Sequence, residues 1–357
     1  MTGIRIADKA ERVDFGTRVV RARIGRMWIR FDLRALVIGI ILAAACVGIV
    51  VAALISGEYP LTLGEVWHAL FSGERDFTRT VVVEWRMPRA LASIVFGAAL
   101  GASGAVFQSL TRNPLASPDI VGFSAGAYTG ALLVIIVAGG TYIEVAAGAF
   151  AGGIATAALV YVLAFKRGIQ GFRLIIVGIA VSAMLSSLNT WLMLTADLDT
   201  ALIAAVWGAG SLNGITWQQA GLGSIIVLVL LALTLATSRP LRQLELGDDA
   251  AQALGVRVEP ARLGLMLISV ALIAVVTAAA GPISFVALAA PQIARRIAVT
   301  PGVSVPLSAL MGAVLLGASD YAALHALPAM LPVGTVTVVI GGGYLIWLLI
   351  HEARRRS

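Results

Sequence analysis

Residues 90–110 read ALASIVFGAALGASGAVFQSL, a run of 21 residues without a single charged side chain. An α-helix rises about 1.5 Å per residue, so this run would be about 31 Å long as a helix, which matches the roughly 30 Å hydrocarbon core of a bilayer. Gly97 and Gly101 stand four residues apart, a spacing that lets two helix backbones approach closely in lipid. The run therefore predicts a closely packed transmembrane helix.

The composition of the whole chain is typical of a membrane protein. Of its 357 residues, 59% are hydrophobic and only 13% are charged, about half the charged fraction of an ordinary soluble domain. Apolar runs recur from end to end and leave no room for a large soluble domain. We predict an all-α membrane protein with about ten transmembrane helices. Its spans are expected at residues 35–55, 90–110, 120–138, 143–165, 174–195, 217–237, 263–281, 283–299, 303–323 and 332–350.

The eighth of these spans is the shortest. Only Ile283–Ala294 precedes Arg295 and Arg296, about 18 Å of helix against the roughly 30 Å needed, so both arginines must extend into the headgroups. The pair Gly281–Pro282 should separate this span from the seventh, because proline cannot continue a helix ladder. The apolar segment Asp199–Gly210 is too short to cross, and we expect a short interfacial helix there.

Small residues recur at the spacing seen in residues 90–110. This pattern fits either packing within one bundle, which we favour, or a seam between two subunits. The glycines concerned are Gly97/Gly101, Gly122/Gly126/Gly130 and Gly148/Gly152.

The distribution of basic residues predicts the orientation. Of the 26 lysines and arginines, 22 fall on one side of the ten spans, and the other side holds only Arg75, Arg79, Arg86 and Arg89. Basic residues mark the cytoplasmic side, so both termini are predicted to be cytoplasmic. Residues 1–34 then form a retained basic tail, and the net charge of +7 reports orientation rather than binding of nucleic acid.

Several kinds of chemistry lack the residues they need. No ionisable residue lies near the centre of a predicted span, where ion-coupled carriers place such groups. The three histidines fall at or beyond span ends, and the single Cys46 has no partner for a disulfide. Neither lysine follows a glycine-rich phosphate-binding loop. We predict no enzymatic activity, no cofactor and no metal site. A transporter of this kind must be driven by another subunit or be a passive pore.

A charged patch interrupts the apolar sequence at residues 239–262, with eight charged side chains in 24 residues. Asp248 and Asp249 are suited to begin a helix, and Gly255 is suited to end it. The pattern fits either a short amphipathic elbow that docks into a groove of a cytoplasmic partner, or a solvated loop on lipid headgroups. Its apolar positions, expected to form one stripe, are Leu246, Ala250, Ala253 and Leu254.

Four segments resemble the permease subunits of bacterial iron-siderophore ABC importers, the group that includes the vitamin B12 permease. They are EWRMPRALASIVFGAALGASGAVFQSLTRNPLASPDIVGFSAGA (84–127), LELGDDAAQALGV (244–256), AGPISFVALAAPQIARR (280–296) and LPVGTVTVVIGGGYLIWLL (331–349). Within the family the chain is most similar to the ferric-enterobactin, or catecholate siderophore, branch. The resemblance covers about residue 34 to the C-terminus and implies a type II ABC importer permease fold, with a ten-helix permease domain at residues 35–351.

The resemblance also implies roles for particular residues. Residues 238–262 match the cytoplasmic coupling helices that dock on the ATPase, through Gly247, Asp248, Asp249, Leu254 and Gly255. Arg86 and Arg89 match outer arginines that receive acidic residues of the substrate-binding protein, although interfacial snorkelling would also place arginines there. Asn113 matches a gate at the inner mouth. Ser182, Ser186 and Asn189 lie on a helix that lines the pathway in relatives, although hydrogen bonding within one subunit explains them equally.

These expectations combine into one function. We predict a permease subunit of an ATP-driven importer that moves an iron(III)–siderophore complex of the catecholate class across the bacterial plasma membrane. Its expected partners are a second, non-identical permease, two ATPase subunits and an external siderophore-binding protein. The alternatives are the same machine importing cobalamin or haem, and an ion-coupled secondary carrier.

Overall fold

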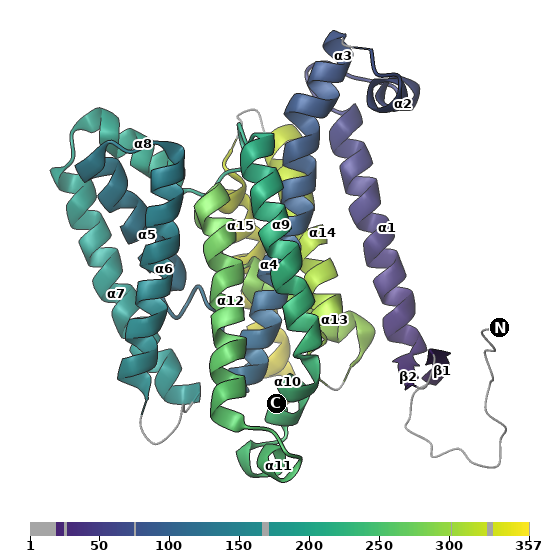
Figure 1. Ribbon diagram of the computed structural model, residues 1–357, viewed down its shortest axis with the longest axis vertical. Coiled ribbons are helices and arrows are strands. Elements are labelled where there is room, and N and C mark those ends of the chain that lie inside the picture. The colour runs from purple at the N-terminus through teal and green to yellow at the C-terminus, as the bar shows by residue number, and fades with distance from the viewer. Residues whose placement is uncertain are drawn as a thin grey trace.

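The computed structural model describes residues 19–24, 27–74, 76–165, 171–300, 302–326 and 331–356, and within them it is an almost entirely helical bundle (Figure 1). A helix lies at each of the ten predicted spans, which confirms the all-α fold class. These helices are α1 (Leu33–Ile55), α4 (Met87–Thr111), α5 (Phe123–Leu133) continued by the π-helix η3 (Val134–Ala138), α6 (Tyr142–Ala164), α7 (Gly171–Thr195), α9 (Trp217–Ala236), α12 (Val258–Ala280), α13 (Val286–Ala298), α14 (Val305–His325) and α15 (Val333–Arg356).

Within the described residues, seven helices are long and apolar enough to cross a membrane. They are α1, the continuous helix Phe77–Thr111, α6, α7, α9, α12 and α14. The segments Phe123–Ala138 and Val333–Trp347 are apolar but shorter, and α13 has 13 residues. Length alone therefore identifies seven of the ten predicted spans.

Figure 1 shows short helices at both ends of the bundle, and we name the ends by them. The inner end carries α10 (Ser238–Glu245) and α11 (Asp248–Ala253), and the outer end carries α2 (Leu63–Phe71), α3 (Phe77–Arg79) and α8 (Leu198–Gly208). The α8 helix confirms the short helix predicted at Asp199–Gly210, with Asp197 as its N-cap. The antiparallel hairpin β1 (Val19–Ile24) and β2 (Met27–Asp32) was not predicted, and most of the basic tail lies outside the described residues.

The helix of residues 90–110 is the centre of the molecule. In α4 most side chains are buried, and the helix packs against α14, α12, α13 and α9. Cβ atoms placed at Gly97 and Gly101 would overlap the carbonyl oxygens of Gly312 and Ser308 on α14. In this pair, glycine is what allows helix backbones to touch.

A second close pair joins α5 to α6. Cβ atoms at Gly126 and Gly130 would overlap Thr156 and the Gly148 carbonyl oxygen, and Gly152 packs back on Gly126. The small-residue pattern is thus confirmed as packing within one subunit. Figure 1 shows α5, α6 and α7 gathered on one side of the bundle, beside α12.

The second span begins earlier than predicted. Helical backbone runs from Phe77 to Thr111 rather than from residue 90, through α3, the π-helix η2 (Thr80–Arg86) and α4. Pro88 lacks an N–H and would clash with the carbonyl four residues before it in a regular α-helix. The wider π-turn, in which the Met87 N–H donates to the Val82 oxygen, lets the helix continue into Pro88.

The predicted break before the eighth span is confirmed. The α12 helix ends at Ala280, Gly281 adopts φ 73°, and α13 starts after Phe285 at φ 69°. The Gly281 conformation, reached easily only by glycine, and Pro282 together stop the helix. The α13 helix is as short as predicted and carries Arg295 and Arg296 in its last turn; it is also amphipathic, which was not predicted.

Candidate functional site

The inner elbow consists of α10 and α11 and joins α9 to α12. The α11 helix begins at Asp248, after Gly247 at φ 113°, and ends in a Schellman motif. In this motif the Gly255 N–H donates to the Gln252 oxygen at 2.9 Å, and the Val256 N–H donates to the Ala251 oxygen at 3.0 Å. Asp248 and Asp249 in the first turn complement the positive end of the helix dipole. Both the predicted start and the predicted stop of this helix are confirmed.

The elbow exposes apolar side chains at the inner end of the molecule. Ala251 is fully buried and fixes α11 to the bundle, whereas Leu254 is 56% exposed and Leu246 is 67% exposed. Asp249, in the first turn of α11, and Gly255, which follows Leu254, are also exposed. The elbow therefore offers two isolated leucines on a polar, charged surface.

The predicted stripe needs one correction. Leu246 is the C-cap of α10 and is separated from α11 by Gly247, so it does not share a helix face with Ala250, Ala253 and Leu254. The glycine conformation breaks the helical period that the spacing assumed.

Asp248 holds the elbow to the bundle. Its Oδ1 accepts from the Arg112 guanidinium at 2.6 Å and from the Arg262 guanidinium at 2.7 Å. Arg112 follows α4, and Arg262, which also pairs with Glu259, lies in the first turns of α12. Burial raises the pKa of the Asp248 carboxyl, but the hydrogen bond and charge of Arg262, with those of Arg112, outweigh it and leave the pKa below its ordinary value. The carboxylate thus remains charged and connects three elements.

Asn113 follows Arg112, the C-cap of α4, in the loop at the inner end of that helix. Its side-chain Oδ1 accepts from the Leu115 N–H at 2.9 Å, and its own N–H donates to the Gln108 oxygen at 3.2 Å. The hydroxyl of Ser109 donates to Glu245 of α10 at 2.5 Å. The predicted gate residue is therefore attached to the elbow through the end of α4.

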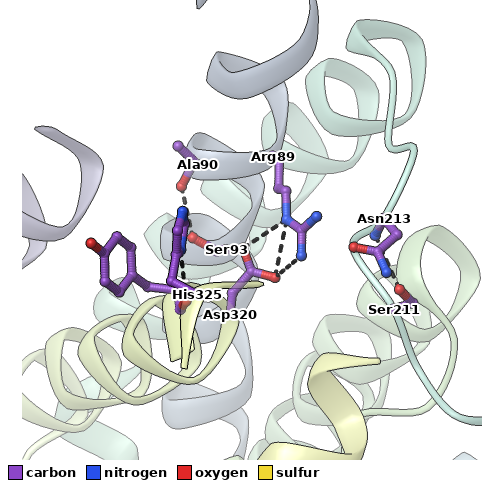
Figure 2. Close-up of polar contacts among 8 residues, drawn as sticks. Arg89, Ala90, Ser93, Ser211, Asn213, Asp320 and His325 are labelled. Atoms are coloured by element: carbon purple, nitrogen blue, oxygen red, sulfur yellow. Dashed lines mark hydrogen bonds and ion pairs between the residues drawn. The ribbon is translucent and has the colours of Figure 1, made fainter. Parts of the chain in front are cut away.

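The predicted outer arginines lie at the opposite end of the bundle. Arg86 donates to the Leu54 oxygen at 2.7 Å and to the Tyr59 oxygen at 2.6 Å, so it caps the end of α1. Figure 2 shows Arg89 and Asp320 facing one another, and Nε and Nη2 of Arg89 donate to both carboxylate oxygens at 2.8–3.2 Å. Both arginines thus bind groups of their own chain.

The Arg89–Asp320 ion pair is largely enclosed by the protein. The two side chains are 15% and 7% exposed. The pair joins α4 to α14, the two helices that pack on each other through Gly97 and Gly312. Sequence reasoning did not single out Asp320. A carboxylate inside a predicted span is costly without a partner, and that is the signal by which it could have been found.

The polar residues of α7 divide into two groups. Asn189 is buried, accepts from the Thr129 hydroxyl at 2.7 Å and donates to the Ala125 oxygen at 3.3 Å, which joins α7 to α5. Ser186 is exposed, and Ser182 is half-buried against Gly122. Asn189 thus makes hydrogen bonds between helices of one subunit, which is the alternative to pathway lining that the sequence left open for these three residues.

The site residues are therefore not one cluster. The elbow and Asn113 meet at the inner end, the arginines lie at the outer end, and the α7 residues lie between. A multi-pass bundle with a charged, partly apolar elbow, in a sequence without a phosphate-binding loop, has the features of the membrane subunit of a transporter driven by a separate ATPase.

Comparison with known proteins agrees with this class. The model of the FecCD transport family matches residues 34–351, and the chain belongs to this family. It is therefore a multi-pass permease subunit of the plasma membrane, a transport component rather than an enzyme. Membership of the family implies that it works with an ATPase, a substrate-binding protein and a second permease subunit.

Individual relatives cover most of the chain. The ferric enterobactin transport system permease protein FepG of Escherichia coli (strain K12) is 49% identical over 90% of this chain and 98% of its own length. The achromobactin transport system permease protein CbrC of Dickeya dadantii (strain 3937) is 37% identical over 83% of this chain and 86% of its own length. A solved inward-facing ABC transporter of the metal-chelate type superposes with a TM-score of 0.79, at 28% identity, over 89% of this chain and 99% of that one.

Proposed function

We propose that the chain is the permease subunit of an ATP-driven importer for ferric siderophores of the catecholate class. The observation that carries this proposal is the 49% identity to a ferric enterobactin permease over 98% of that relative's length. The chemistry of the chain is compatible with such a cargo. A ferric siderophore is large and often anionic, and a path without fixed charge at its centre would pass it without trapping it.

We propose the following assembly for this importer. Ten helices span the membrane, with residues 1–34 and the C-terminus in the cytoplasm. The permease domain covers residues 35–351. A second, non-identical permease completes the pathway, two ATPase subunits bind from inside, and a siderophore-binding protein binds from outside.

In this assembly residues 238–262, which contain the elbow and the start of α12, dock on the ATPase. Leu254 and Asp249 are exposed for contact, while Gly247 and Gly255 set the ends of α11. Asp248 is bound to Arg112 and Arg262, and so its role is to transmit the elbow's movement to α4 and α12.

The pathway residues follow from the same assembly. Ser186 and the part of Ser182 left exposed offer hydroxyls to the cargo, and Asn189 holds α7 against α5. Asn113 gates the inner mouth in this proposal, which its hydrogen bond to Leu115 and the bond of Ser109 to Glu245 at the same end of α4 support.

Uptake in a deletion strain tests the cargo. We expect loss of iron-55 uptake from a ferric catecholate complex, with unchanged uptake of labelled cobalamin and haem, because the sequence matches a catecholate permease across nearly its whole length. Return of iron uptake on complementation is the control. Normal iron uptake together with lost cobalamin or haem uptake would show that the cargo is cobalamin or haem and not a ferric siderophore. Iron uptake that survives substitution of the ATPase's phosphate-binding lysine would favour an ion-coupled carrier.

We propose that Arg89, together with Arg86, docks carboxylates of the binding protein by exchanging its intramolecular partner. Asp320→Asn weakens the ion pair that occupies Arg89, so the affinity of the permease for the binding protein should rise several-fold. The same change leaves the enclosed Arg89 without its charged partner, so the free energy of unfolding should fall by about 3 kcal/mol. Arg89→Gln should weaken association about tenfold. Glu84→Gln, a change of an exposed carboxylate near Arg86, is the control. If surface plasmon resonance on nanodiscs gives unchanged affinity for both variants, the pair only holds α4 against α14.

A further inference from the structure

The outer helix α2 has three different faces. It begins with a complete capping box, in which Thr62 and Glu65 satisfy each other's backbone N–H groups, so its helical period is well defined. At about 100° per residue, Val66 and Ala69 fall in one sector. A second sector contains Leu63, Trp67 and Phe71. The third contains Gly64, Glu65, His68 and Ser72.

The first sector packs on the protein. Val66 and Ala69 are buried in a cluster with Leu54, from the last turn of α1, and with Val81 and Val82 of η2. The Arg79 guanidinium donates to the Ala69 oxygen at 2.8 Å and closes the end of α2. Because Leu54 marks the outer end of a membrane-spanning helix, α2 lies at the depth where the bilayer meets water.

The second sector is apolar and uncovered. Leu63 is 64% exposed, Trp67 is 67% exposed and Phe71 is 68% exposed, and the rings of Trp67 and Phe71 lie 4.4 Å apart between centroids. The third sector, which is also exposed, is polar and includes His68 and Glu65. A helix standing in water has no physical reason to separate its exposed surface into an apolar and a polar arc.

The position of α2 identifies what covers the apolar arc. Figure 1 shows α2 beyond the end of α1, at the edge of the bundle, lying across the direction of the long helices. The α1 helix is apolar and largely exposed, so its outward surface contacts lipid, and the arc of α2 begins where that surface ends. Tryptophan is enriched at this boundary because its ring suits the headgroup region. The polar arc has no lysine or arginine that would seek phosphate groups.

We propose that α2 is an interfacial anchor of the outer leaflet, with Leu63, Trp67 and Phe71 in the lipid and Glu65 and His68 in water. The anchor fixes the level of the α1–α4 connection in the bilayer. Through the bonds of Arg86 to Leu54 and Tyr59, it also sets the height of the outer end of the bundle. The attraction is apolar, so it should not depend on the charge of the lipids.

Spin labels on the two exposed arcs test this anchor. The single native cysteine is removed as Cys46→Ala, and labels are placed at Trp67→Cys and Phe71→Cys on the apolar arc and at His68→Cys and Ser72→Cys on the polar arc. Ile40→Cys on α1, where Ile40 is 61% exposed, gives the value for lipid contact. The assembled importer is studied in nanodiscs of zwitterionic lipid and of lipid containing phosphatidylglycerol.

We expect the collision rate with oxygen, relative to that with a water-soluble nickel chelate, to be several-fold higher at the apolar arc than at the polar arc. In both lipids the ratio at the apolar arc should lie well above the polar-arc value and below the Ile40→Cys value, because Ile40 lies within the span of α1 and α2 lies at its outer end. Equal nickel access at all four positions would overturn the proposal. Water-accessible labels that become immobile when the binding protein is added would assign the arc to that protein instead. Label access does not measure transport, so either result is independent of the cargo.

Discussion

Replacing Asp249 by arginine and Leu254 by glutamate is expected to abolish ATP-driven uptake while the permease still inserts and folds. Both side chains are exposed at the inner end, with Leu254 56% exposed, so the change disturbs no buried contact of the chain. A glutamate buried without a partner in an apolar groove costs several kcal/mol, enough to reduce binding of the ATPase by orders of magnitude. The measurements are co-purification of the ATPase and iron-55 uptake.

The matched control is Asp199→Arg, the same charge reversal in the first turn of α8, at the opposite end of the bundle, which the proposed orientation puts outside the cell. Wild-type uptake is expected there. Full uptake and normal co-purification in the Asp249→Arg, Leu254→Glu variant would show that the elbow is not part of the docking surface.

The Asp248→Asn variant separates docking of the ATPase from transmission of its movement to the bundle. It should retain the ATPase but transport more slowly, because the connection to Arg112 and Arg262 is weakened.

The main features of the fold follow from the sequence because lipid imposes a simple rule. A spanning helix must satisfy its backbone internally and be apolar over its length, so apolar runs predict helices directly. Residues 90–110 illustrate this, since their glycines also predicted the close contact that α4 makes with α14. The ends of α11 were predictable too, because Gly255 supplies a backbone conformation that other residues avoid.

Outside the lipid the same reasoning predicted less. The α2 helix was missed although Thr62 and Glu65 form a capping box that can be read in the sequence, because nine residues give little periodicity. The extension of the second span to Phe77 depends on a π-helix that accommodates Pro88, which local propensity does not indicate.

Residue partners were the least predictable feature of the site. Arg89 and Asp320 are 231 residues apart in the sequence, and Arg112 and Asp248 are 136 apart. Only the packing of α4 against α14, and of the elbow beneath α4, brings each pair together. Charge and position predicted that Arg89 and Arg112 lie at opposite ends of the bundle, but not that each binds a carboxylate of its own chain.

Adding one methyl group at Gly104 should have the largest effect on folding of any single substitution considered. A Cβ atom there would overlap the backbone carbonyl oxygen of Ala287 on α13, and α4 and α13 are both buried at the contact. Backbone atoms cannot move aside as a flexible side chain can, so the two helices must separate. Gly104→Ala should therefore lose about 3 kcal/mol or more of stability, which a thermal unfolding scan in detergent would measure.

The chain provides two controls for the same methyl group. At Gly153 the nearest neighbour of an added Cβ is 3.5 Å away, so Gly153→Ala should be tolerated. At Gly48 on α1 nothing lies within 4 Å, and Gly48→Ala should stabilise the helix slightly, by up to about 1 kcal/mol. Equal melting temperatures for all three variants would show that α4 and α13 do not touch at Gly104. In that case contacts other than the one at Gly104 would have to hold α13 in its position against α4.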